Sequence, residues 1–455
     1  MKILFIGARL FDDVYFYLKE KGIYSILTES NENAPNLDLA DEYHIVARGM
    51  EEPMKIAIEK NVDAVVPLIG IDPPLVDVAI MKEKLEKEYN IPVIFPNKIP
   101  VEICSNKFLT KEFFKIYNIN TPNYFFFANN NNNQYNKFIN DYQEFINDIE
   151  TINVNNINNI KNNENIKNIK YIKNINNNEK IKSSDEIKIN EESNFTTYLH
   201  NLVLNSLKIN EYNKNEIPFD FPYVLKQGEG QGGKDLIIGE DEKSFLDYVN
   251  NFPTTLVEEY IDGYELSIEV LSYNDEYVPL VPVYKGDTSL KANHPLNKVR
   301  YAPAEIEGLD NQVVKEEAIK IAKALAVEGT IDIDFIFSKV DHKLYAIEIN
   351  TRPSGTRYLS YASTSISPLL SLVDMIINNF SNKVVDDKIK NYYAIEVPVG
   401  DYDGPKLKEP IKKFSKNSWV VHGPKGYERV TVSGESKEKL NELTKNLNLE
   451  RFISK

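Results

Sequence analysis

Residues 223–238 contain two short apolar runs with a glycine-rich segment between them. This stretch limits the possible folds more than any other part of the sequence. Four of the six residues from 228 to 233 are glycines, which is more than a simple hairpin turn needs. Glycine accepts positive φ and lets backbone N–H groups approach a ligand closely, which suits a phosphate. Residues 235–239 predict a strand, so the glycines lie at the tip of a hairpin. The pattern favours a phosphate-covering loop with Lys226 at its entrance, over an ordinary turn.

The hairpin context excludes two common phosphate-binding motifs. Residues 228–233 match G-x-G-x-x-G, and residues 228–234 match G-x-x-x-x-G-K. Both motifs must open a helix, whereas the next predicted helix begins only near Glu240. Asp235 also stands where the second motif needs Ser or Thr for Mg²⁺. We therefore expect neither a dinucleotide-binding fingerprint nor a P-loop.

Length and charge narrow the class of protein. At 455 residues the chain is long enough for two or three domains with separate cores. The formal net charge of −15 disfavours nucleic acid and anionic membranes as partners. Cys104 is the single cysteine of the sequence, which excludes an internal disulfide and a cysteine-based zinc site. Because no apolar run reaches the ~20 residues of a membrane helix and none indicates a signal peptide, we expect a cytoplasmic protein.

Residues 1–97 alternate strands with helices, which predicts a doubly wound parallel domain of Rossmann type. The strands are expected at 2–6, 23–27, 62–68 and 91–95, and the helices at 11–21 and 74–89. Gly7 alone makes no dinucleotide fingerprint, so we do not expect NAD here. The unit is instead a scaffold able to present Gly70 and Asp72 to a substrate.

Residues 98–385 predict a second, mixed α/β and α+β domain with an interruption. A helix over 101–118 carries Lys107, and a strand follows at 124–127. Residues 129–216 are then rich in Asn, Ile and Lys, apart from a helix-like stretch near 197–207. Such low complexity predicts a mostly disordered insertion, with a partner-binding arm as the alternative.

The chain after residue 219 returns to ordered patterns. Helices are expected at 242–250, 315–328 and 367–380, strands at 255–259, 265–274, 276–283, 331–338 and 343–349, and loops at 287–302 and 351–357. Residues 386–455 predict a small α+β appendage with strands at 392–398, 419–422 and 428–432 and a helix at 437–446.

Four oxygen-bearing side chains lie two apart on the strands of the 331–349 hairpin and at its end. They are Asp332 and Asp334 on one strand, and Glu348 and Asn350 on the other. Side chains at i and i+2 share one face of a strand, so these groups converge. Such a set suits Mg²⁺, whereas a solvated polar face is the alternative. Crowded like charges favour the cation, since they repel one another without it.

Two arginines follow this set directly. Arg352 and Arg357 are placed to hold anionic groups beside the metal. Acids, metal, arginines and a glycine-rich flap are together the parts of a phosphoryl-transfer site.

The spaced motifs resemble those of the ATP-grasp superfamily over about residues 1–380. They are Lys107, K-x-x-x-G-x-G-G from Lys226, V-E-E-Y-I-x-G-x-E ending at Glu265, Asp334, and E-I-N-x-R from Glu348. The chain departs from the family at Gln227, where proline is usual, and at Asp235, where the last glycine is usual. Both departures concern the position of the flap.

The resemblance implies a role for each matching residue. ATP would be bound by Lys107, Lys226, Gly230, Gly232, Gly233, Glu258, Glu259, Ile261 and Glu265. Asp334, Glu348 and Asn350 would ligate two Mg²⁺, with Mn²⁺ as an alternative metal, and Arg300, Arg352 and Arg357 would be catalytic. Lys291, His294 and Lys298 are candidates to line the substrate entrance together with Arg300.

Two subfamilies share further patterns with the chain. Residues 286–287, A-P-A at 302–304 and the stretch 348–357 are similar to one synthetase half of the carbamoyl-phosphate synthetase large subunit. Arg352, Y-A-S from Tyr361, and Ile366 resemble the lysine ligase of pyrrolysine biosynthesis. The resemblance implies an ATP-dependent carboxylate–amine ligase acting on small amino-acid-like substrates through an acyl phosphate, with a homodimer as a possible state.

Two other functions stay open at this point. One is a bicarbonate- or carbamate-activating enzyme, with or without a partner chain that supplies ammonia. The other is a non-catalytic nucleotide sensor, which the complete acid set disfavours because a sensor need not keep both metals.

Overall fold

The computed structural model describes residues 1–128, 207–209, 217, 219–228, 230, 235–252, 254–290, 298–405 and 414–453. Most of the predicted insertion and of the helix near 197–207 therefore lies outside the described residues. The same holds for Gly232, Gly233, Lys291 and His294. Among the helices that the structure describes, none has the length and apolar character needed to span a membrane.

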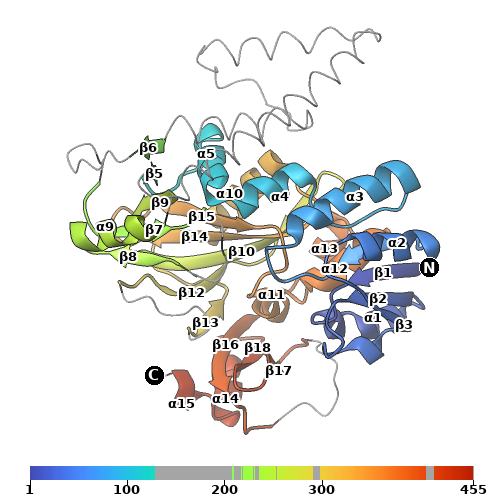
Figure 1. Cartoon of the computed structure of the whole chain (residues 1–455). Helices are drawn as coiled ribbons and strands as arrows, with labels where there is room; N and C mark the ends of the chain where they lie inside the picture. Colours follow the sequence, from blue (N-terminus) through green and yellow to red (C-terminus); the bar gives the residue numbers. More distant parts are fainter. Residues whose placement is uncertain are drawn as a thin grey trace, which may run out of the picture.

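The N-terminal part contains a four-stranded parallel sheet in the order β3-β2-β1-β4 (Figure 1). Its elements are β1 (Lys2–Ile6), η1 (Phe11–Asp13), α1 (Tyr15–Glu20), β2 (Tyr24–Glu29), η2 (Leu37–Leu39), β3 (Glu42–Ile45), α2 (Glu51–Glu59), β4 (Ala64–Pro67) and α3 (Leu75–Tyr89). Ile3 and Phe5 enter one apolar cluster, whereas Leu4 and Ile6 enter another on the opposite face. Because both faces are covered, the prediction of a doubly wound parallel sheet is confirmed.

Several local predictions in this part were wrong. The sequence analysis missed β3, an edge strand whose residues Tyr43 and Ile45 are exposed, and the helix α2. The strand predicted at 91–95 is only a bridge between Val65 and Val93. Pro92 and Pro96 carry no N–H group, so this segment cannot extend a ladder.

The helix predicted over 101–118 is in fact two helices, α4 (Lys98–Ser105) and α5 (Lys107–Ile116). Asn106 separates them with extended backbone, and its side chain accepts hydrogen bonds from the amides of Phe108 and Leu109. Asn106 is thus the N-cap of α5. This places Lys107 at the first position of α5.

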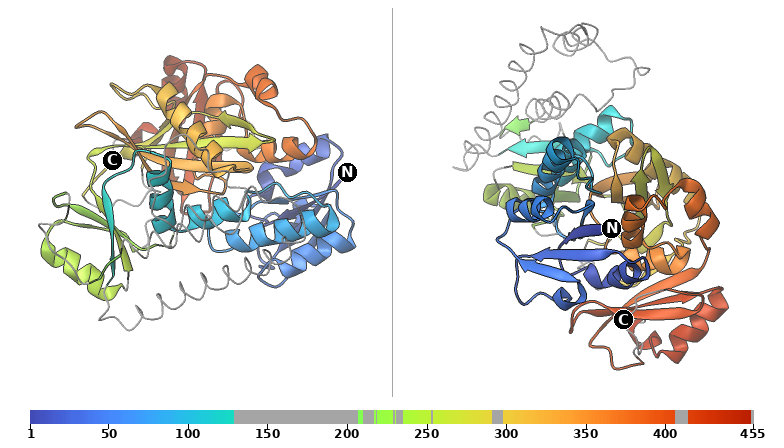
Figure 2. Two further views of the ribbon diagram at one scale, coloured as in Figure 1. Left: turned by 90° about the horizontal axis from the view of Figure 1, so that it is seen from above. Right: turned by 90° about the vertical axis from the view of Figure 1, so that its right-hand side faces the viewer.

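A five-stranded sheet in the order β6-β5-β9-β7-β8 follows. Its strands are β5 (Tyr124–Ala128), β6 (Leu207–Ile209), β7 (Tyr223–Lys226), β8 (Ile237–Gly239) and β9 (Thr254–Glu259), and α9 (Glu242–Asn251) packs against it. Figure 2 shows these strands and α9 at one end of the molecule. Because β7 and β8 pair antiparallel, the prediction that the glycine-rich segment is a hairpin tip is confirmed.

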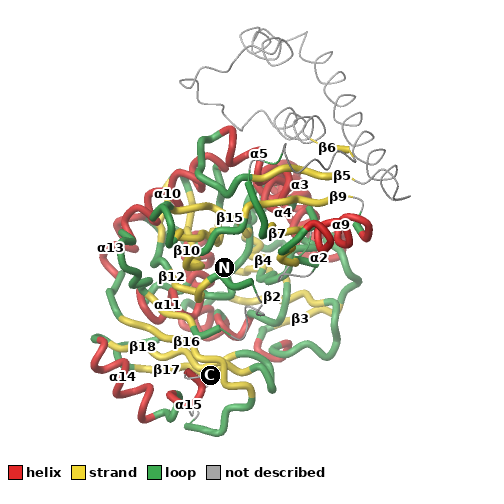
Figure 3. Tube along the Cα trace, turned by 90° about the vertical axis from the view of Figure 1, so that its left-hand side faces the viewer, coloured by secondary structure: helices red, strands yellow, loops and turns green. Residues whose placement is uncertain are grey.

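A nine-stranded sheet forms the largest layer, with β11 paired to β10 and the other strands in the order β15-β14-β10-β12-β13-β16-β18-β17 (Figure 3). These strands are β10 (Gly263–Tyr273), β11 (Glu276–Pro279), β12 (Val283–Asp287), β13 (Arg300–Ala302), β14 (Gly329–Ser338), β15 (Leu344–Asn350), β16 (Tyr393–Gly400), β17 (Ser418–His422) and β18 (Glu428–Gly434). The apolar face of α10 (Asn311–Leu325) packs against β10 and β14 in one core cluster.

Three predictions in this sheet need correction. The strand expected over 276–283 is split into β11 and β12, because Pro279 and Pro282 cannot donate to a ladder. The loop expected over 287–302 ends in a strand, so Arg300 lies in β13. The expected helix over 367–380 is α12 (Pro368–Ile376), with α11 (Arg357–Thr364) before it and α13 (Asn382–Lys388) after it.

The C-terminal residues form the small α+β appendage that the sequence predicts, with α14 (Lys437–Asn446) and α15 (Glu450–Ile453) beside the strands β16, β17 and β18. These strands continue the large sheet, because β16 pairs with β13. In this pairing Arg300 lies opposite Glu396. The domain boundaries at residues 97 and 385 remain predictions.

Candidate functional site

Four of the predicted nucleotide-binding residues lie on two sheets that residues 260–262 connect, and Lys107 lies on α5. Lys226 ends β7 and Glu258 lies on the neighbouring β9, in the five-stranded sheet. Glu265 lies on β10 of the nine-stranded sheet. Glu259 is the last residue of β9, and the buried Ile261 belongs to the connection itself. The chain thus passes from one sheet to the other at the segment predicted to receive adenine.

Glu258 joins two lysines in a buried group, here called the Glu258 cluster: Glu258, Lys111 and Lys226. The carboxylate forms ion pairs with both Lys111 and Lys226, and only 2 % of Glu258 is exposed. Burial alone would raise the pKa of Glu258, but the two cations lower it to about 2. Burial lowers the pKa of Lys111 to about 8. At neutral pH the cluster holds two cations for one anion, and this excess positive charge suits a phosphate.

Lys111 is a member of this cluster that the sequence analysis missed. It lies one helical turn after Lys107 in α5, and this i, i+4 spacing was the available signal. The Lys111 ammonium also donates to the Thr121 hydroxyl, which donates to the carbonyl of Ala346 at 2.7 Å. Ala346 precedes Glu348 by two residues on β15. Lys111 therefore links the Glu258 cluster to the strand that carries Glu348.

The glycine-rich tip rests on the start of α5. The Lys107 ammonium donates to the carbonyl of Gly230 at 2.8 Å, and its amide donates to that of Gly228 at 2.7 Å. Gly230 has φ of +127°, a conformation that side chains other than hydrogen rarely allow. A Cβ at Gly228 would lie 3.3 Å from the Phe108 ring. Gly228 and Gly230 thus allow this part of the tip to approach Lys107.

The acid set predicted on the hairpin is formed by the register of β14 and β15. Asp334 lies opposite Glu348, and Asp332 lies opposite Asn350. Burial, together with the nearby Asp334, raises the pKa of Asp332 to about 6. This shift shows the charge crowding that the sequence analysis expected.

Lys285 pairs with the acid set, and Lys298 pairs with the nearby predicted ribose ligand, Glu265. Lys285 Nζ lies 2.7 Å from Asp334 Oδ1, and Lys298 Nζ lies 2.9 Å from Glu265 Oε2. Burial would lower the pKa of Lys285, but Asp334 and Asp332 raise it. The sequence analysis missed Lys285, which is on β12 next to the Gly-Asp pair at 286–287.

The acid set fits Mg²⁺ with help from a substrate. Within the described residues, no three His, Cys, Asp or Glu side chains are grouped to hold a metal ion by themselves. Asp334 and Glu348 supply two carboxylates, and Asn350 supplies an amide oxygen on the same strand as Glu348. Mg²⁺ commonly takes one or two protein carboxylates together with phosphate oxygens and waters. This donor set is therefore suited to Mg²⁺ that arrives with a nucleotide.

Arg352 joins the acid set to the N-terminal sheet. Its Nε forms an ion pair with Asp72, and its Nη2 donates to Asn350 Oδ1 at 3.3 Å. Asp72 follows β4 in the parallel sheet. The scaffold therefore presents Asp72 to Arg352, beside the predicted metal ligands.

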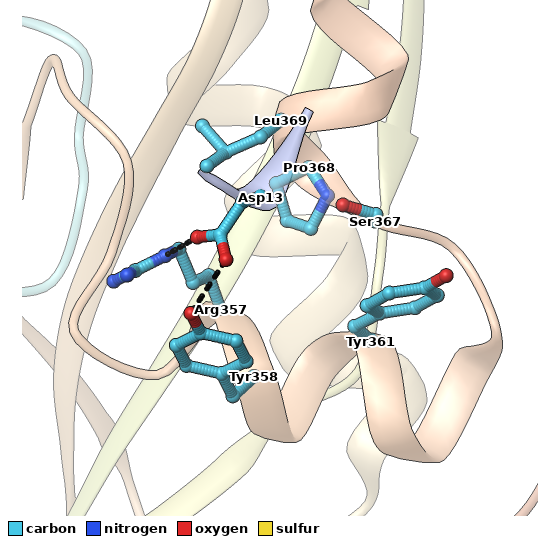
Figure 4. Close-up of a pocket in the computed structure, with 7 residues that line it drawn as sticks. All are labelled: Asp13, Arg357, Tyr358, Tyr361, Ser367, Pro368 and Leu369. Carbon is cyan, nitrogen blue, oxygen red and sulfur yellow. Dashed lines mark hydrogen bonds and ion pairs between the residues drawn. The ribbon is translucent and has the colours of Figure 1, made fainter. Parts of the chain in front are cut away.

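Arg357 makes a second junction with the N-terminal sheet and lines a cavity of about 240 Å³, including space open to solvent (Figure 4). Arg357 Nε lies 3.4 Å from Asp13 Oδ2, and the Tyr358 hydroxyl donates to Asp13 Oδ1 at 2.6 Å. The other lining residues are Tyr361, Ser367, Pro368 and Leu369. The cavity is thus lined by the charged side chains of Asp13 and Arg357 and by aromatic and apolar side chains.

Arg300 is paired with Glu396 and not with the acid set. It is 5 % exposed, and its Nη1 donates to Glu396 Oε1 and to the carbonyl of Gly355, each at 3.2 Å. Gly355 belongs to the loop between Arg352 and Arg357. Arg300 therefore contacts the arginine-bearing loop from the C-terminal side.

Comparisons with known proteins agree with this geometry. Residues 192–356 match the family model of the ATP-grasp domain. A carbamoyl-phosphate synthase of Methanobrevibacter smithii is 44 % identical over 447 residues, which cover 98 % of this chain and 100 % of that protein. This chain belongs to the ATP-grasp family. The resemblance inferred from the motifs is thereby confirmed.

Solved structures show the same fold at low identity. The biotin carboxylase domain of Hydrogenobacter thermophilus 2-oxoglutarate carboxylase, solved with MgADP and bicarbonate, has a TM-score of 0.63 at 16 % identity and matches 98 % of this chain and 89 % of that one. An L-amino acid ligase from Bacillus licheniformis has the same TM-score and identity, covering 98 % of this ATP-grasp chain and 97 % of that one.

Family membership settles the reaction class. The chain is an ATP-binding ATP-grasp ligase, and such ligases form C–N bonds and release ADP. This favours an enzyme over the non-catalytic sensor that the sequence left open. The framework is that of the carboxylate–amine ligases.

Proposed function

We propose that this chain activates the carboxylate of a small amino-acid-like substrate with ATP and couples it to an amine, releasing ADP and phosphate. One observation carries the proposal: Arg352 and Arg357 follow the acid set, and each is paired with a carboxylate of the N-terminal part, Asp72 and Asp13 respectively. Side chains of both signs are thus available where the two parts of the molecule meet, beside the predicted phosphoryl-transfer site. A substrate with carboxylate and ammonium groups suits that arrangement.

The nucleotide end would hold ATP by its phosphates. Lys226 and Lys107 would contact the phosphates, with the glycine-rich tip above them, and Glu265 would bind the ribose hydroxyls. The backbone of Glu259 and Ile261 would receive adenine beside Glu258. Lys111 supports the proposal because it ties this end to the strand of Glu348.

Asp334, Glu348 and Asn350 would hold Mg²⁺, which supplies charge neutralisation at the phosphates when bound. We propose two ions, with Mn²⁺ able to replace Mg²⁺. Lys285, now paired with Asp334, would be released toward a phosphate oxygen once the carboxylate binds a cation. A lysine that can exchange a carboxylate for a phosphate in this way suits a site whose net charge changes when the nucleotide and metal bind.

The reaction would proceed in two balanced steps. A carboxylate oxygen of the substrate attacks the γ-phosphorus, and the bond from that phosphorus to the bridging oxygen breaks to release ADP. The amine then attacks the carbonyl carbon of the acyl phosphate, loses a proton, and expels inorganic phosphate. Arg352 is placed to stabilise the charge that develops on the transferred group. Arg357 would orient the second substrate group.

The proposal is tested by incubating the protein with ATP, Mg²⁺ and pooled amino acids and amines, while ADP release is followed. We expect ADP release that depends on a carboxylate, and a condensed product that mass spectrometry identifies. Adding hydroxylamine should divert the acyl phosphate to a hydroxamate. Carboxylate-independent ADP release, with no hydroxamate from any pool, would contradict the proposal.

A second candidate is the activation of bicarbonate or carbamate. It is favoured by the full-length match to the carbamoyl-phosphate synthase of M. smithii. In that case ADP release depends on bicarbonate and needs no other carboxylate, and ammonia, free or from a partner chain, replaces the amine. Bicarbonate-dependent ADP release in carboxylate-free buffer distinguishes the two candidates.

Oligomeric state and compartment belong to the same proposal. We propose a homodimer in the cytoplasm, without nucleic-acid or membrane partners. Light scattering on the purified protein gives its mass in solution, and a monomer at assay concentration would refute the dimer.

A further inference from the structure

Glu396 lies at the centre of a buried polar group in the C-terminal strands, here called the Glu396 cluster: Glu396, Arg300, Arg429, His422 and Thr431. Its fully buried carboxylate lies 2.6 Å from Arg429 Nε and 3.2 Å from Arg300 Nη1. His422 Nε2 is 3.4 Å from its second oxygen, and the Thr431 hydroxyl donates to that oxygen at 3.4 Å. Burial alone would raise the pKa of Glu396, but Arg429, His422 and Arg300 hold it far below its usual range.

A first arm of the cluster reaches the loop that carries the two substrate arginines. Besides Glu396, the Arg300 guanidinium binds the carbonyl of Gly355 at 3.2 Å. Gly355 lies between Arg352 and Arg357 in the chain. Because Arg300 is almost fully buried, this contact is a fixed link between β13 and the loop.

A second arm reaches the wall of the cavity. The His422 ring stacks on Tyr358, with centroids 3.9 Å apart and planes 28° apart. The Tyr358 hydroxyl donates to Asp13, which also accepts from Arg357 Nε. The two arms therefore hold residues 355 and 358, on either side of Arg357, from the same carboxylate.

We propose that Glu396 is a positioning residue, which holds the segment 351–358, and with it Arg352 and Arg357, in the geometry that the ligase reaction needs. Arginine suits this task because its planar guanidinium binds two acceptors at once and keeps its charge when buried. The appendage thereby supports the substrate end of the site, although none of its residues touches the reacting atoms.

The same sheet offers a matched control that contacts α11 beyond this segment, at Ala362. Ser433 lies on β18, is fully buried, and donates to the carbonyl of Ala362 in α11 at 2.7 Å. It therefore shares the burial and the strand region of the Glu396 cluster. If the contacts of Glu396 only stabilised the fold, their loss should change the kinetic constants no more than loss of the contact between Ser433 and Ala362.

The kinetic test compares Glu396→Gln with Ser433→Ala at a temperature where both are folded. Glu396→Gln keeps the shape of the side chain and removes its charge, so the segment loses its anchor. We expect kcat/KM for the carboxylate substrate to fall roughly a hundredfold, as for a misplaced catalytic group. The KM for ATP should stay within about twofold, because the Glu258 cluster lies on the other sheet. Ser433→Ala should leave both constants within about twofold.

A second test needs no turnover, so the failure of the ligase proposal and of this inference can be told apart. Amide hydrogen exchange in peptides covering 351–358 should be at least about tenfold faster in Glu396→Gln than in the wild type. Peptides covering 254–261 should be unchanged in the same sample. Ser433→Ala should alter neither set.

Further variants keep the inference falsifiable if Glu396→Gln does not fold. His422→Phe keeps the stack on Tyr358 and loses the contact with Glu396, and should have the smaller effect on kcat/KM. Arg300→Lys should retain part of the activity that Arg300→Met loses. Equal effects of Glu396→Gln and Ser433→Ala, or parallel changes in the KM for ATP and for the carboxylate, would overturn the inference.

Discussion

Glu258 and Glu396 are both buried carboxylates that hold two cationic side chains, yet their surroundings differ. The cations of Glu258 are Lys111 and Lys226, and Lys226 lies at the foot of the glycine-rich tip. The cations of Glu396 are Arg300 and Arg429, which also bind the backbone carbonyls of residues 355 and 298. One cluster adjoins the loop predicted to cover phosphates, and the other adjoins the loop that carries Arg352 and Arg357.

The choice of cation explains the difference. A lysine ammonium is a point charge that can exchange a carboxylate for a phosphate without a fixed geometry. An arginine in the interior holds several acceptors in one plane and stays in place. The Glu258 cluster, at the proposed nucleotide end, therefore suits an exchange of partners, whereas the Glu396 cluster suits fixed contacts.

The largest loss of activity is expected from a substitution in the acid set, which lies between the two clusters in the proposed site. Glu348→Gln removes one of the two carboxylates proposed to bind Mg²⁺, and should reduce ADP release by at least about a thousandfold while weak ATP binding remains. ADP release and calorimetric ATP binding measure the two effects. Glu316→Gln, on the exposed side of α10, is the control with normal turnover. Retained turnover in Glu348→Gln would contradict the assignment of Glu348 as a metal ligand.

A smaller effect is expected from the exchangeable cation of the Glu258 cluster. Lys226→Met should raise the KM for ATP by roughly a hundredfold, because a phosphate loses its charge partner. Lys243→Met, on the exposed start of α9, should change nothing. If Arg429→Met weakened ATP binding as much as Lys226→Met, the two clusters would not differ in the way described.

Among the described residues, no cation is directly paired with the buried carboxylate of Glu269, and its pKa differs accordingly from that of Glu258 and Glu396. Burial and the neighbouring Asp332 raise its pKa from 4.5 to about 8. Since the folded protein keeps this proton longer than the unfolded chain, its contribution to stability is complete below 4.5 and is lost as pH rises through about 8.

Urea unfolding of the wild type and of Glu269→Gln, compared at each pH, isolates this titration, because Lys111, whose pKa of about 8 in the folded protein gives a slope of the opposite sign, is present in both. The window from pH 7 to 8 lies above the unfolded-state pKa of His422, 6.5, and above the Asp332 pKa of about 6. There the Glu269 term should lower the free energy of unfolding by up to about 1.4 kcal/mol per pH unit. The difference in the free energy of unfolding between the wild type and Glu269→Gln should show this slope, and parallel curves for the two would contradict the assignment.

The smallest effect is expected from shortening the Asn-rich insertion. Deleting residues 129–188 should change kcat/KM by less than about twofold, because long surface insertions cost little free energy. Steady-state kinetics of the shortened chain check this. A large loss of activity with an unchanged fold would favour the partner-binding arm instead.

The nucleotide end could largely be predicted from the sequence, because its signals are local. Spacing by two residues on each strand predicted that the acid set converges, and the register of β14 and β15 places Asp334 opposite Glu348. The glycine-rich hairpin was predicted from its flanking apolar runs. Even Lys111 had a local signal, since it follows Lys107 by one turn of α5.

The C-terminal end could not be predicted, because its partners are far apart in the chain. Arg300 and Glu396 meet only through the pairing of β13 with β16, and no spacing rule connects them. Arg300 was predicted to lie in a polar loop, whereas it lies buried in a strand, and its catalytic role stays a prediction. Because the pairing of β13 with β16 is long-range, the sequence predicted neither the contact of Arg300 with Gly355 nor the positioning function proposed for the appendage.

The central claim is that a carboxylate oxygen attacks the γ-phosphorus of ATP. Once the carboxylate substrate is identified, it can be labelled with ¹⁸O and allowed to react in unlabelled water. Mass spectrometry of the released phosphate should then show one ¹⁸O atom per phosphate, because the acyl-phosphate oxygen leaves with phosphorus. Unlabelled phosphate, accompanied by normal product formation, would contradict the account.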